Sequence, residues 1–204
     1  MSVDLKKTTT RRLINHDRRG EVKKYQIIYA DPPWPVQKIK RACRPNQIEM
    51  DYQTMSVEDI CNLPIEHITE DNASLFLWTT HKFLPQSFEV IKRWGFKYQR
   101  TITWDKSNGM CLFGFHHRTE FLLFGYRGKI EMYPRKKAIP TLLSYKSPRH
   151  SQKPDEIRNI ISSFGQTRIE LFARQKTEGW DVWGDEVESD IMLDIKPLPP
   201  PTRR

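Results

Sequence analysis

The sequence predicts an α/β protein with a mainly parallel, twisted sheet flanked by helices. Short apolar runs of strand length alternate along the chain with segments whose apolar residues repeat at helical spacing, and this alternation is typical of parallel sheets. The first run, residues 25–29, is mostly apolar and shows no strict alternation, as expected of a strand that is buried on both faces. With 204 residues, of which 37% are hydrophobic and 11% aromatic, the chain can bury the core of one domain.

Five segments have the composition of strands. The first is expected over residues 25–29. It runs directly into a loop that contains an acid, two prolines and a tryptophan, Ala30-Asp31-Pro32-Pro33-Trp34. In open α/β sheets, ligands bind outside the carboxyl ends of the strands, so this loop is a candidate site. The other four strands are expected over Ser74–Thr79, Lys97–Trp104, Phe121–Tyr126 and Arg168–Ala173.

Two helices are expected between the first three strands. Ser56 is a favourable N-cap, with Asp59 three positions on, for a short helix that ends near Leu63. Apolar residues then repeat at roughly helical spacing over residues 84–94, and Gly95 provides a stop at the carboxyl end.

A third helix is expected to begin at Pro154, whose fixed φ suits the first helical position, and to end at Gly165. Between the expected elements lie long segments without a strong period. Loops of such length in a compact domain are usually functional or disordered. These segments are residues 35–50, 105–118 and 127–150.

The net charge of +9 and the pI of about 9.5 favour a polyanionic partner. We expect a basic, loosely ordered arm over residues 1–24, a single domain over 25–190 and a proline-rich tail over 191–204. Residues 178–190 hold six acids and no base. Residues 127–153 hold eight bases and one acid, and we prefer phosphate contact to a solvated face for these bases: Arg127, Lys129, Arg135, Lys136, Lys137, Lys146, Arg149 and Lys153.

The cysteines are three in number and scattered, which fits a reducing compartment and no disulfide framework. His116 and His117 lie near Cys111, but adjacent side chains rarely ligate one ion well, so no metal site is expected. No apolar run reaches the length of a membrane span, and the first 24 residues lack the apolar core of a signal peptide. We therefore expect a cytoplasmic protein without a membrane segment.

The sequence from Asp31 to Trp34 suits chemistry on an amino-substituted base. The exocyclic amine of adenine is a poor nucleophile because its lone pair is spread into the ring. The Asp31 carboxylate and the Pro32 carbonyl can each accept one amine hydrogen, which draws the lone pair back to nitrogen, while Pro33 stiffens the loop and Trp34 stacks on the base. The alternative is structural: Asp-Pro is a common turn after a strand, and the tryptophan is then a packing residue.

Seven motifs in order resemble the messenger-RNA adenosine-N6 methyltransferases and their bacterial and phage DNA-methylating relatives. The resemblance covers roughly residues 25 to 187 and implies a Rossmann-like methyltransferase fold with S-adenosylmethionine as donor. In that fold the catalytic loop precedes the donor-binding strand in the chain, a permuted order. The motifs are Ala30–Trp34, Tyr52–Ser56, Leu75–Trp78, Trp104–Lys106, Gln152–Ile157, Arg168–Arg174 and Gly179–Gly184.

The resemblance implies three groups of site residues. The catalytic loop is Asp31, Pro32, Pro33 and Trp34. The donor site is Asp31, Lys153, Glu170, Arg174, Asp185 and Glu186. The substrate site is Trp34, Tyr52, Trp78 and Lys106, to which the basic residues Arg135, Lys136 and Lys137 are added as phosphate contacts.

Each implied role has a structural alternative. Lys153 can be a solvated turn residue, Glu170 can pair with Arg168, and Tyr52 and Trp78 can be core aromatics. Trp104 and Trp183 are interpreted first as packing residues. The sequence also departs from the family, because Gln175-Lys176-Thr177 replaces a histidine-asparagine step and Asp185-Glu186 replaces an asparagine-glutamine pair. Asp17 is a weak candidate for an acidic donor-binding residue that some members place before the first strand.

Four functions compete at this point. An adenine-N6 methyltransferase of DNA is favoured, and the same chemistry on RNA is the second interpretation. A catalytically inactive nucleic-acid-binding subunit is the third, although the intact Asp31–Trp34 loop argues against it. A methyltransferase of protein or small-molecule amines is the fourth, and the basic loops argue against that one. A homodimer or a partner subunit is possible in each case.

The basic segment is testable as a phosphate contact. Replacing Arg135, Lys136 and Lys137 with alanine should weaken nucleic-acid binding and flatten its dependence on salt, because fewer counterions are then released. Titrations at several salt concentrations measure both quantities. An unchanged affinity and slope would show that this segment does not contact phosphate.

Overall fold

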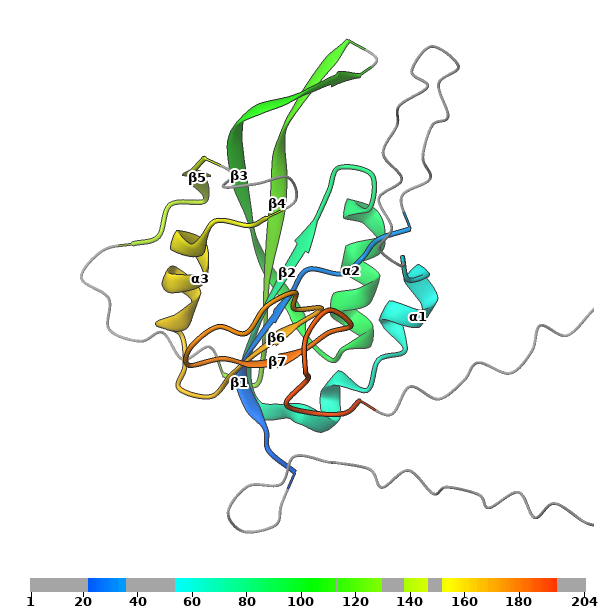
Figure 1. Cartoon of the computed structure of the whole chain (residues 1–204), viewed down its shortest axis with the longest axis vertical. Helices are drawn as coiled ribbons and strands as arrows, with labels where there is room; N and C mark the ends of the chain where they lie inside the picture. Colours follow the sequence, from blue (N-terminus) through cyan, green and yellow to red (C-terminus); the bar gives the residue numbers. More distant parts are fainter. Residues whose placement is uncertain (1–21, 36–53, 113, 130–137, 147–151, 194–204) are drawn as a thin grey trace, which may run out of the picture.

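The computed structural model describes residues 22–35, 54–112, 114–129, 138–146 and 152–193. Its core is a seven-stranded sheet with the order β5-β3-β4-β2-β1-β6-β7 (Figure 1). Strands β1, β2, β6 and β7 pair in parallel, β4 pairs antiparallel with both β2 and β3, and β5 is parallel to β3. Six strands therefore point one way and β4 alone is reversed, which agrees with the mainly parallel sheet expected from the sequence.

The interior strand β1 (Tyr25–Ala30) precedes the short helix α1 (Val57–Cys61) and a 3-10 turn (Ile65–Ile68). The order continues with β2 (Thr69–Thr79), α2 (Leu84–Arg93), β3 (Lys97–Leu112), β4 (Phe115–Arg127) and β5 (Leu142–Ser144). Helix α3 (Asp155–Ser162), β6 (Arg168–Leu171) and β7 (Asp181–Trp183) complete the sheet. Among the described residues, no helix is long and apolar enough to cross a membrane.

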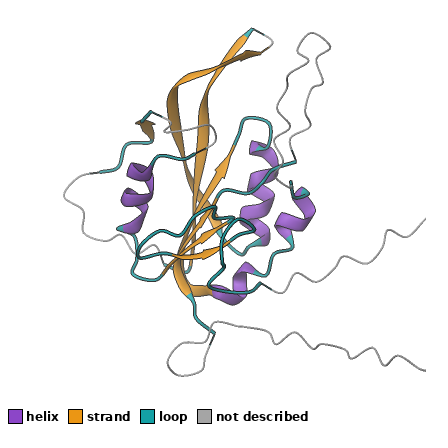
Figure 2. Cartoon of the chain, viewed as in Figure 1, coloured by secondary structure: helices purple, strands orange, loops and turns teal. Residues whose placement is uncertain are grey.

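Helices cover both faces of the sheet, with α1 and α2 on one face and α3 on the other (Figure 2). Successive side chains of a strand point to opposite faces, so each central strand contributes to two cores. On β1, Ile28 packs into the core beneath α1 and α2, whereas Ile27 packs into the core beneath α3. Burial on both faces explains why the sequence of this strand, apart from Gln26, is apolar and does not alternate.

The expected caps agree with the structure to within a residue. The Ser56 side chain accepts a hydrogen bond from the Asp59 amide at the start of α1, and Gly95 follows α2 with φ +79°. Pro154 is the N-cap of α3 and not its first helical residue, so the helix begins one position later than expected. Strand β2 starts five residues before the expected Ser74, and β5 and β7 were not anticipated.

The expectation of a loop over residues 105–118 is wrong. These residues continue β3 and β4 as a two-stranded hairpin that extends beyond the other strands of the sheet (Figure 1). The pairing shifts register between Asp105 and Met110, so the ribbon is irregular. None of the described side chains of this extension packs in a core. Its sequence therefore carries no apolar alternation from which a strand is recognised.

The assignment of the core can be tested by replacing a buried leucine and an exposed leucine of the sheet with alanine. Leu77 of β2 is fully buried between β1 and β4, so Leu77→Ala should lower the free energy of unfolding by about 2–5 kcal/mol. Leu142 of β5 is 58% exposed, and Leu142→Ala should cost less than about 0.5 kcal/mol. Urea denaturation measures both, and equal losses would contradict this description of the core.

Candidate active site

Asp31 is the first residue after β1 and lies at the carboxyl edge of the sheet. Its predecessor Ala30 pairs with Leu77 of β2 on one side and with Leu171 of β6 on the other. The loops that follow β1, β2 and β6 therefore leave the sheet side by side. The expected position of the polar loop, outside the carboxyl end of a central strand, is confirmed by this pairing.

The loop after Asp31 is held by its backbone and by Trp34. The Pro32 carbonyl accepts a hydrogen bond from the Trp34 amide at 2.8 Å, and the Pro33 carbonyl accepts one from the Met55 amide at 2.9 Å. The Trp34 side chain is 5% exposed, stacks on Phe83 at 5.5 Å between ring centroids, and donates its indole hydrogen to the Trp78 carbonyl. In this structure Trp34 is a packing residue, and it has no open face for a base.

A row of alternating charges begins at Asp31. Its Oδ2 contacts Lys153 Nζ at 2.7 Å, and the same ammonium lies 3.4 Å from Glu120 Oε2. Glu120 Oε1 in turn contacts Lys106 Nζ at 3.0 Å. Lys153 is 12% exposed and stands 5.3 Å over the Trp78 ring, so it is not the solvated turn residue of the structural alternative.

The neighbouring charges favour the ionised forms of Glu120 and Lys153. Burial alone would raise the pKa of Glu120, but the ammonium groups of Lys153 and Lys106 outweigh burial and lower that pKa. Burial alone would lower the pKa of Lys153, but the carboxylates of Asp31 and Glu120 outweigh it and raise that pKa. Lys153 is therefore a permanent cation at neutral pH and cannot act as a general base.

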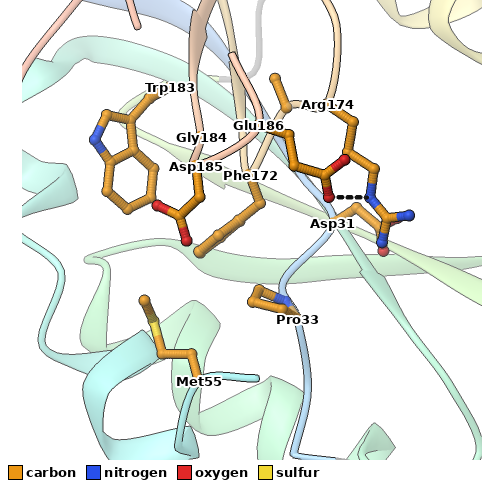
Figure 3. Close-up of a pocket in the computed structure, with 10 residues that line it drawn as sticks. Asp31, Pro33, Met55, Phe172, Arg174, Trp183, Gly184, Asp185 and Glu186 are labelled. Atoms are coloured by element: carbon orange, nitrogen blue, oxygen red, sulfur yellow. Dashed lines mark ion pairs between the residues drawn. The ribbon is translucent and has the colours of Figure 1, made fainter. Parts of the chain in front are cut away.

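A cavity of about 430 Å³ opens on the other side of Asp31, between the ends of β6 and β7 (Figure 3). Its volume is in the range of sites for small ligands. The wall combines aromatic, sulfur, cationic and acidic side chains. The lining residues are Asp31, Pro33, Met55, Phe172, Ala173, Arg174, Trp183, Gly184, Asp185 and Glu186.

Two backbone features shape this cavity. Phe172 has φ +61°, which ends β6 before the expected Ala173, and its ring packs edge-on against Trp183. A non-glycine residue in this conformation costs free energy and is often found at functional sites. Gly184 lies against the backbone of Ala173, where a β-carbon would collide with the carbonyl oxygen. The close approach brings the two loops together around the cavity.

Glu170 lies on β6 but is not among the residues that line the cavity. Its carboxylate faces the Arg158 guanidinium of α3, with Nη2 at 3.2 Å from Oε1 and Nε at 3.1 Å from Oε2. The expected alternative partner, Arg168, instead donates to backbone carbonyls of Ser162 and Gly165. Burial raises the pKa of Glu170 in spite of Arg158.

The structure brings four of the expected donor-site residues to the cavity: Asp31, Arg174, Asp185 and Glu186. Arg174 Nε and Glu186 Oε1 form an ion pair of 3.6 Å in its wall (Figure 3). Trp78 is fully buried and donates its indole hydrogen to the Tyr29 hydroxyl, and Trp104 is a buried packing residue as expected. Tyr52, Arg135, Lys136, Lys137 and Asp17 lie outside the described residues.

Sequence reasoning missed Glu120, Met55 and Phe172 as members of the site. Met55 and Phe172 fall inside the quoted motifs, so their positions were available but not their roles. Glu120 lies between motifs, and also between the loop expected over 105–118 and the strand expected from Phe121. Nothing in its local sequence distinguishes it from a solvated acid.

The cavity fits the chemistry of S-adenosylmethionine. Phe172 and Trp183 offer aromatic faces for an adenine, Arg174 offers a cation for a carboxylate, and Asp31, Asp185 and Glu186 offer acceptors for hydroxyl and ammonium groups. These residues follow strands of a parallel sheet at its carboxyl edge, as in methyltransferases of the Rossmann-like class. The fold and the cavity together define a methyltransferase that uses S-adenosylmethionine.

Comparison with known proteins identifies the family. The model of the family described as MT-A70 matches residues 25–186, and the chain belongs to this family of adenine-N6 methyltransferases. The Type II methyltransferase M.MunI of Mycoplasma sp. is 32% identical over 186 residues, which are 81% of this chain and 78% of that protein. The human N(6)-adenosine-methyltransferase catalytic subunit METTL3 is 27% identical over 184 residues, which are 84% of this chain.

The match differs in extent between these relatives. The chain spans only 30% of the length of human METTL3, against most of the length of M.MunI. The N6-adenosine-methyltransferase non-catalytic subunit MTB of Arabidopsis thaliana is 38% identical over 86 residues, which are 42% of this chain and 11% of that protein.

The contact beneath the cavity yields a prediction about donor binding. Gly184→Ala should weaken the binding of S-adenosylmethionine about 10-fold or more, because the loop that carries Asp185 and Glu186 must move away from Ala173. Gly165→Ala is the control, since a β-carbon there would also be crowded, 2.9 Å from Gln26 Cβ, but away from the cavity. Calorimetric titration measures affinity and thermal melting measures stability. Equal affinity losses in both variants would contradict the prediction.

Proposed function

We propose that this chain is a site-specific methyltransferase of the adenine N6 amine in DNA, with Asp31 as the central catalytic residue. The observation that carries the proposal is that Asp31 both lines the cavity that fits the donor and forms an ion pair with Lys153 through Oδ2. The carboxylate therefore stands at the boundary between a donor site and the loop proposed to receive the base.

The preference for DNA rests on the extent of the similarity. The bacterial type II methyltransferase matches over 78% of its length and at higher identity than human METTL3, which matches over 30% of its length. RNA is the second candidate substrate, because the METTL3 proteins are named as adenosine methyltransferases. In a duplex the N6 edge of adenine is paired, so the target base must be unpaired or flipped out to reach Asp31.

The loop Asp31–Trp34 is proposed to activate the N6 amine of the target adenine. Within the described part of the chain, the hydrogen bond that Asp31 accepts from Lys153 goes to Oδ2, and Oδ1 is the oxygen proposed to accept one amine hydrogen. The Pro32 carbonyl has a second lone pair beside the one that accepts from Trp34, and this lone pair can accept the other hydrogen. Both hydrogen bonds return electron density to the nitrogen and fix its direction.

S-adenosylmethionine supplies an electrophilic methyl group on a sulfonium ion when it is bound. Arg174, Asp185 and Glu186 are the residues proposed to hold it, with Phe172 and Trp183 beside its base. After transfer the amine nitrogen is positively charged and strongly acidic, and its proton passes to Asp31 or to water. Lys153 keeps its own proton and acts as a fixed positive charge that orients Asp31.

Trp34 is assigned to support of the loop and not to stacking. Its ring is already stacked on Phe83 and its indole hydrogen is already bound. We therefore expect the partner that stacks on the target base to be Tyr52, which the family resemblance places in the acceptor pocket. Tyr52 lies outside the described residues, so this expectation rests on the sequence.

A non-catalytic subunit is the remaining alternative, in view of the match to MTB. The intact Asp31–Trp34 loop and the cavity beside it favour an active enzyme. A partner subunit or a homodimer stays possible for either function, because the names of METTL3 and MTB describe subunits.

The proposal is tested by methyl transfer from labelled S-adenosylmethionine to matched DNA and RNA, each single- and double-stranded. The products are digested and identified by mass spectrometry. N6-methyladenine in DNA is the expected result. Methylation confined to RNA would move the assignment to the second substrate. Donor binding without transfer to any substrate would indicate that a partner or a particular recognition sequence is required.

The role of Asp31 yields its own prediction. Asp31→Ala should reduce methyl transfer about 100-fold or more, because an acceptor of the amine hydrogen is lost, while most donor affinity remains. Asp155→Ala is the matched control, since Asp155 is an exposed acid that pairs with Arg158 at the start of α3. Single-turnover rates and donor titration measure the two effects. Substantial residual transfer by Asp31→Ala would refute the catalytic role.

A further inference from the structure

Glu120 occupies a particular place where the hairpin meets the sheet. Thr79, the last residue of β2, pairs with Phe121 of β4, so Glu120 is the first residue of β4 beyond the end of β2. On its other side it pairs with Trp104 of β3. Glu120 therefore stands at the same carboxyl edge as Asp31, although it lies on the one reversed strand.

The side chain of Glu120 is 18% exposed and is divided between two ammonium groups. One carboxylate oxygen contacts Lys106 and the other faces Lys153, which in turn holds Asp31. The four charges alternate in sign and sum to zero, and they come from four separate segments of the chain. An isolated buried carboxylate would be costly, but two cations satisfy this one.

Lys153 needs more than one partner at this position. Its ammonium is nearly buried over the face of Trp78, where three hydrogens must find acceptors or water. Glu120 draws it to one side, and the hydrogen bond that Lys153 donates to Asp31 goes to Oδ2. Without the negative charge of Glu120, the same ammonium would be drawn to both oxygens of Asp31. The oxygen needed for the amine hydrogen would then be occupied.

We propose that Glu120 is a positioning residue of the transferase, which holds Lys153 in a shared ion pair so that one oxygen of Asp31 stays open to the target amine. The proposal rests on the role of Asp31 proposed above and adds a residue that none of the sequence motifs contains. Lys106 completes the arrangement by balancing the second oxygen of Glu120.

The test is the isosteric variant Glu120→Gln in the full chain. A neutral amide accepts from one lysine and presents its NH₂ group to the other, so kcat at saturating substrate should fall about 10- to 100-fold. The dissociation constant of S-adenosylmethionine should stay within about twofold, because Glu120 does not line the donor cavity. Glu120→Asp keeps the charge and should recover part of kcat.

Asp105→Asn is the matched control on the same pair of strands. Asp105 forms an exposed ion pair with Arg118 and contacts neither lysine of the row. The variant removes one carboxylate from the hairpin, as Glu120→Gln does, and should leave kcat unchanged. Equal losses of kcat in the two variants would reduce Glu120 to a structural element of the hairpin and overturn the proposal.

The double variant Glu120→Gln with Lys106→Met separates position from charge. It restores the net charge of the row but leaves Lys153 with Asp31 as its carboxylate. If Glu120 positions Lys153, the double variant should be as slow as Glu120→Gln alone. Recovery of kcat to the wild-type value would mean that Glu120 only neutralises Lys106, and would overturn the proposal.

A crystal structure of Glu120→Gln gives a readout that does not depend on activity. Lys153 Nζ is expected within hydrogen-bond distance of both Asp31 oxygens, and an unchanged contact with Oδ2 alone would overturn the proposal. If the wild type methylates neither DNA nor RNA, the proposed function fails, but this structure still tests the position of Lys153. If the variant does not fold, Lys106→Met tests the same point, since Glu120 should then draw Lys153 from Asp31 and lower kcat.

Discussion

The pairing of β1 with neighbours on both sides is the constraint from which the site follows. Ala30 is bonded in register between Leu77 of β2 and Leu171 of β6, so the backbone that leads into Asp31 cannot shift without breaking two ladders. The prolines then limit the conformations of the residues that follow. A catalytic carboxylate must be held to within a fraction of an ångström, and the role proposed for Asp31 depends on this attachment to the interior of the sheet.

Two different kinds of contact surround Asp31. On the side of β6 and β7 the walls are aromatic rings and close backbone packing, which shape a cavity. On the side of β3 and β4 the neighbours are charged groups that neutralise one another. The first side is suited to a bound molecule with a large flat ring, and the second is suited to holding a charged side chain still. Asp31 contacts both sides, because it lines the cavity and pairs with Lys153.

Much of this organisation was predictable from the sequence, and the misses have physical causes. The strand before Asp31 and helix α2 were recognised because burial imposes a strong apolar pattern on them. The hairpin over residues 105–118 was missed because a ribbon outside the core has no such pattern. Trp34 was expected to stack on a base, since its type suits that role. Its burial against Phe83 depends on a contact between segments far apart in the chain, which local sequence does not reveal.

The site shows the same division. Asp31 and Arg174 were expected because motifs contain them, and Asp185 and Glu186 because they replace an asparagine-glutamine pair of the family. All four line the cavity. Glu170 also lies in a motif, yet its carboxylate forms an ion pair with Arg158. Nothing in the sequence indicated this role of Arg158. Glu120 was not marked at all. Its significance comes from strand order, because a reversed strand brings a distant acid beside Lys153.

The reversal of β4 has a consequence for how such enzymes diversify. Because β4 runs against its neighbours, the hairpin of β3 and β4 leaves the sheet at the edge where Asp31 lies and not at the opposite edge. Residues can be added or removed in pairs at the tip of this hairpin while Trp104 and Glu120 keep their pairing and the sheet keeps its register. The length of the hairpin, and with it the distance to which it extends toward a substrate, can thus change during evolution while the residues around Asp31 keep their positions.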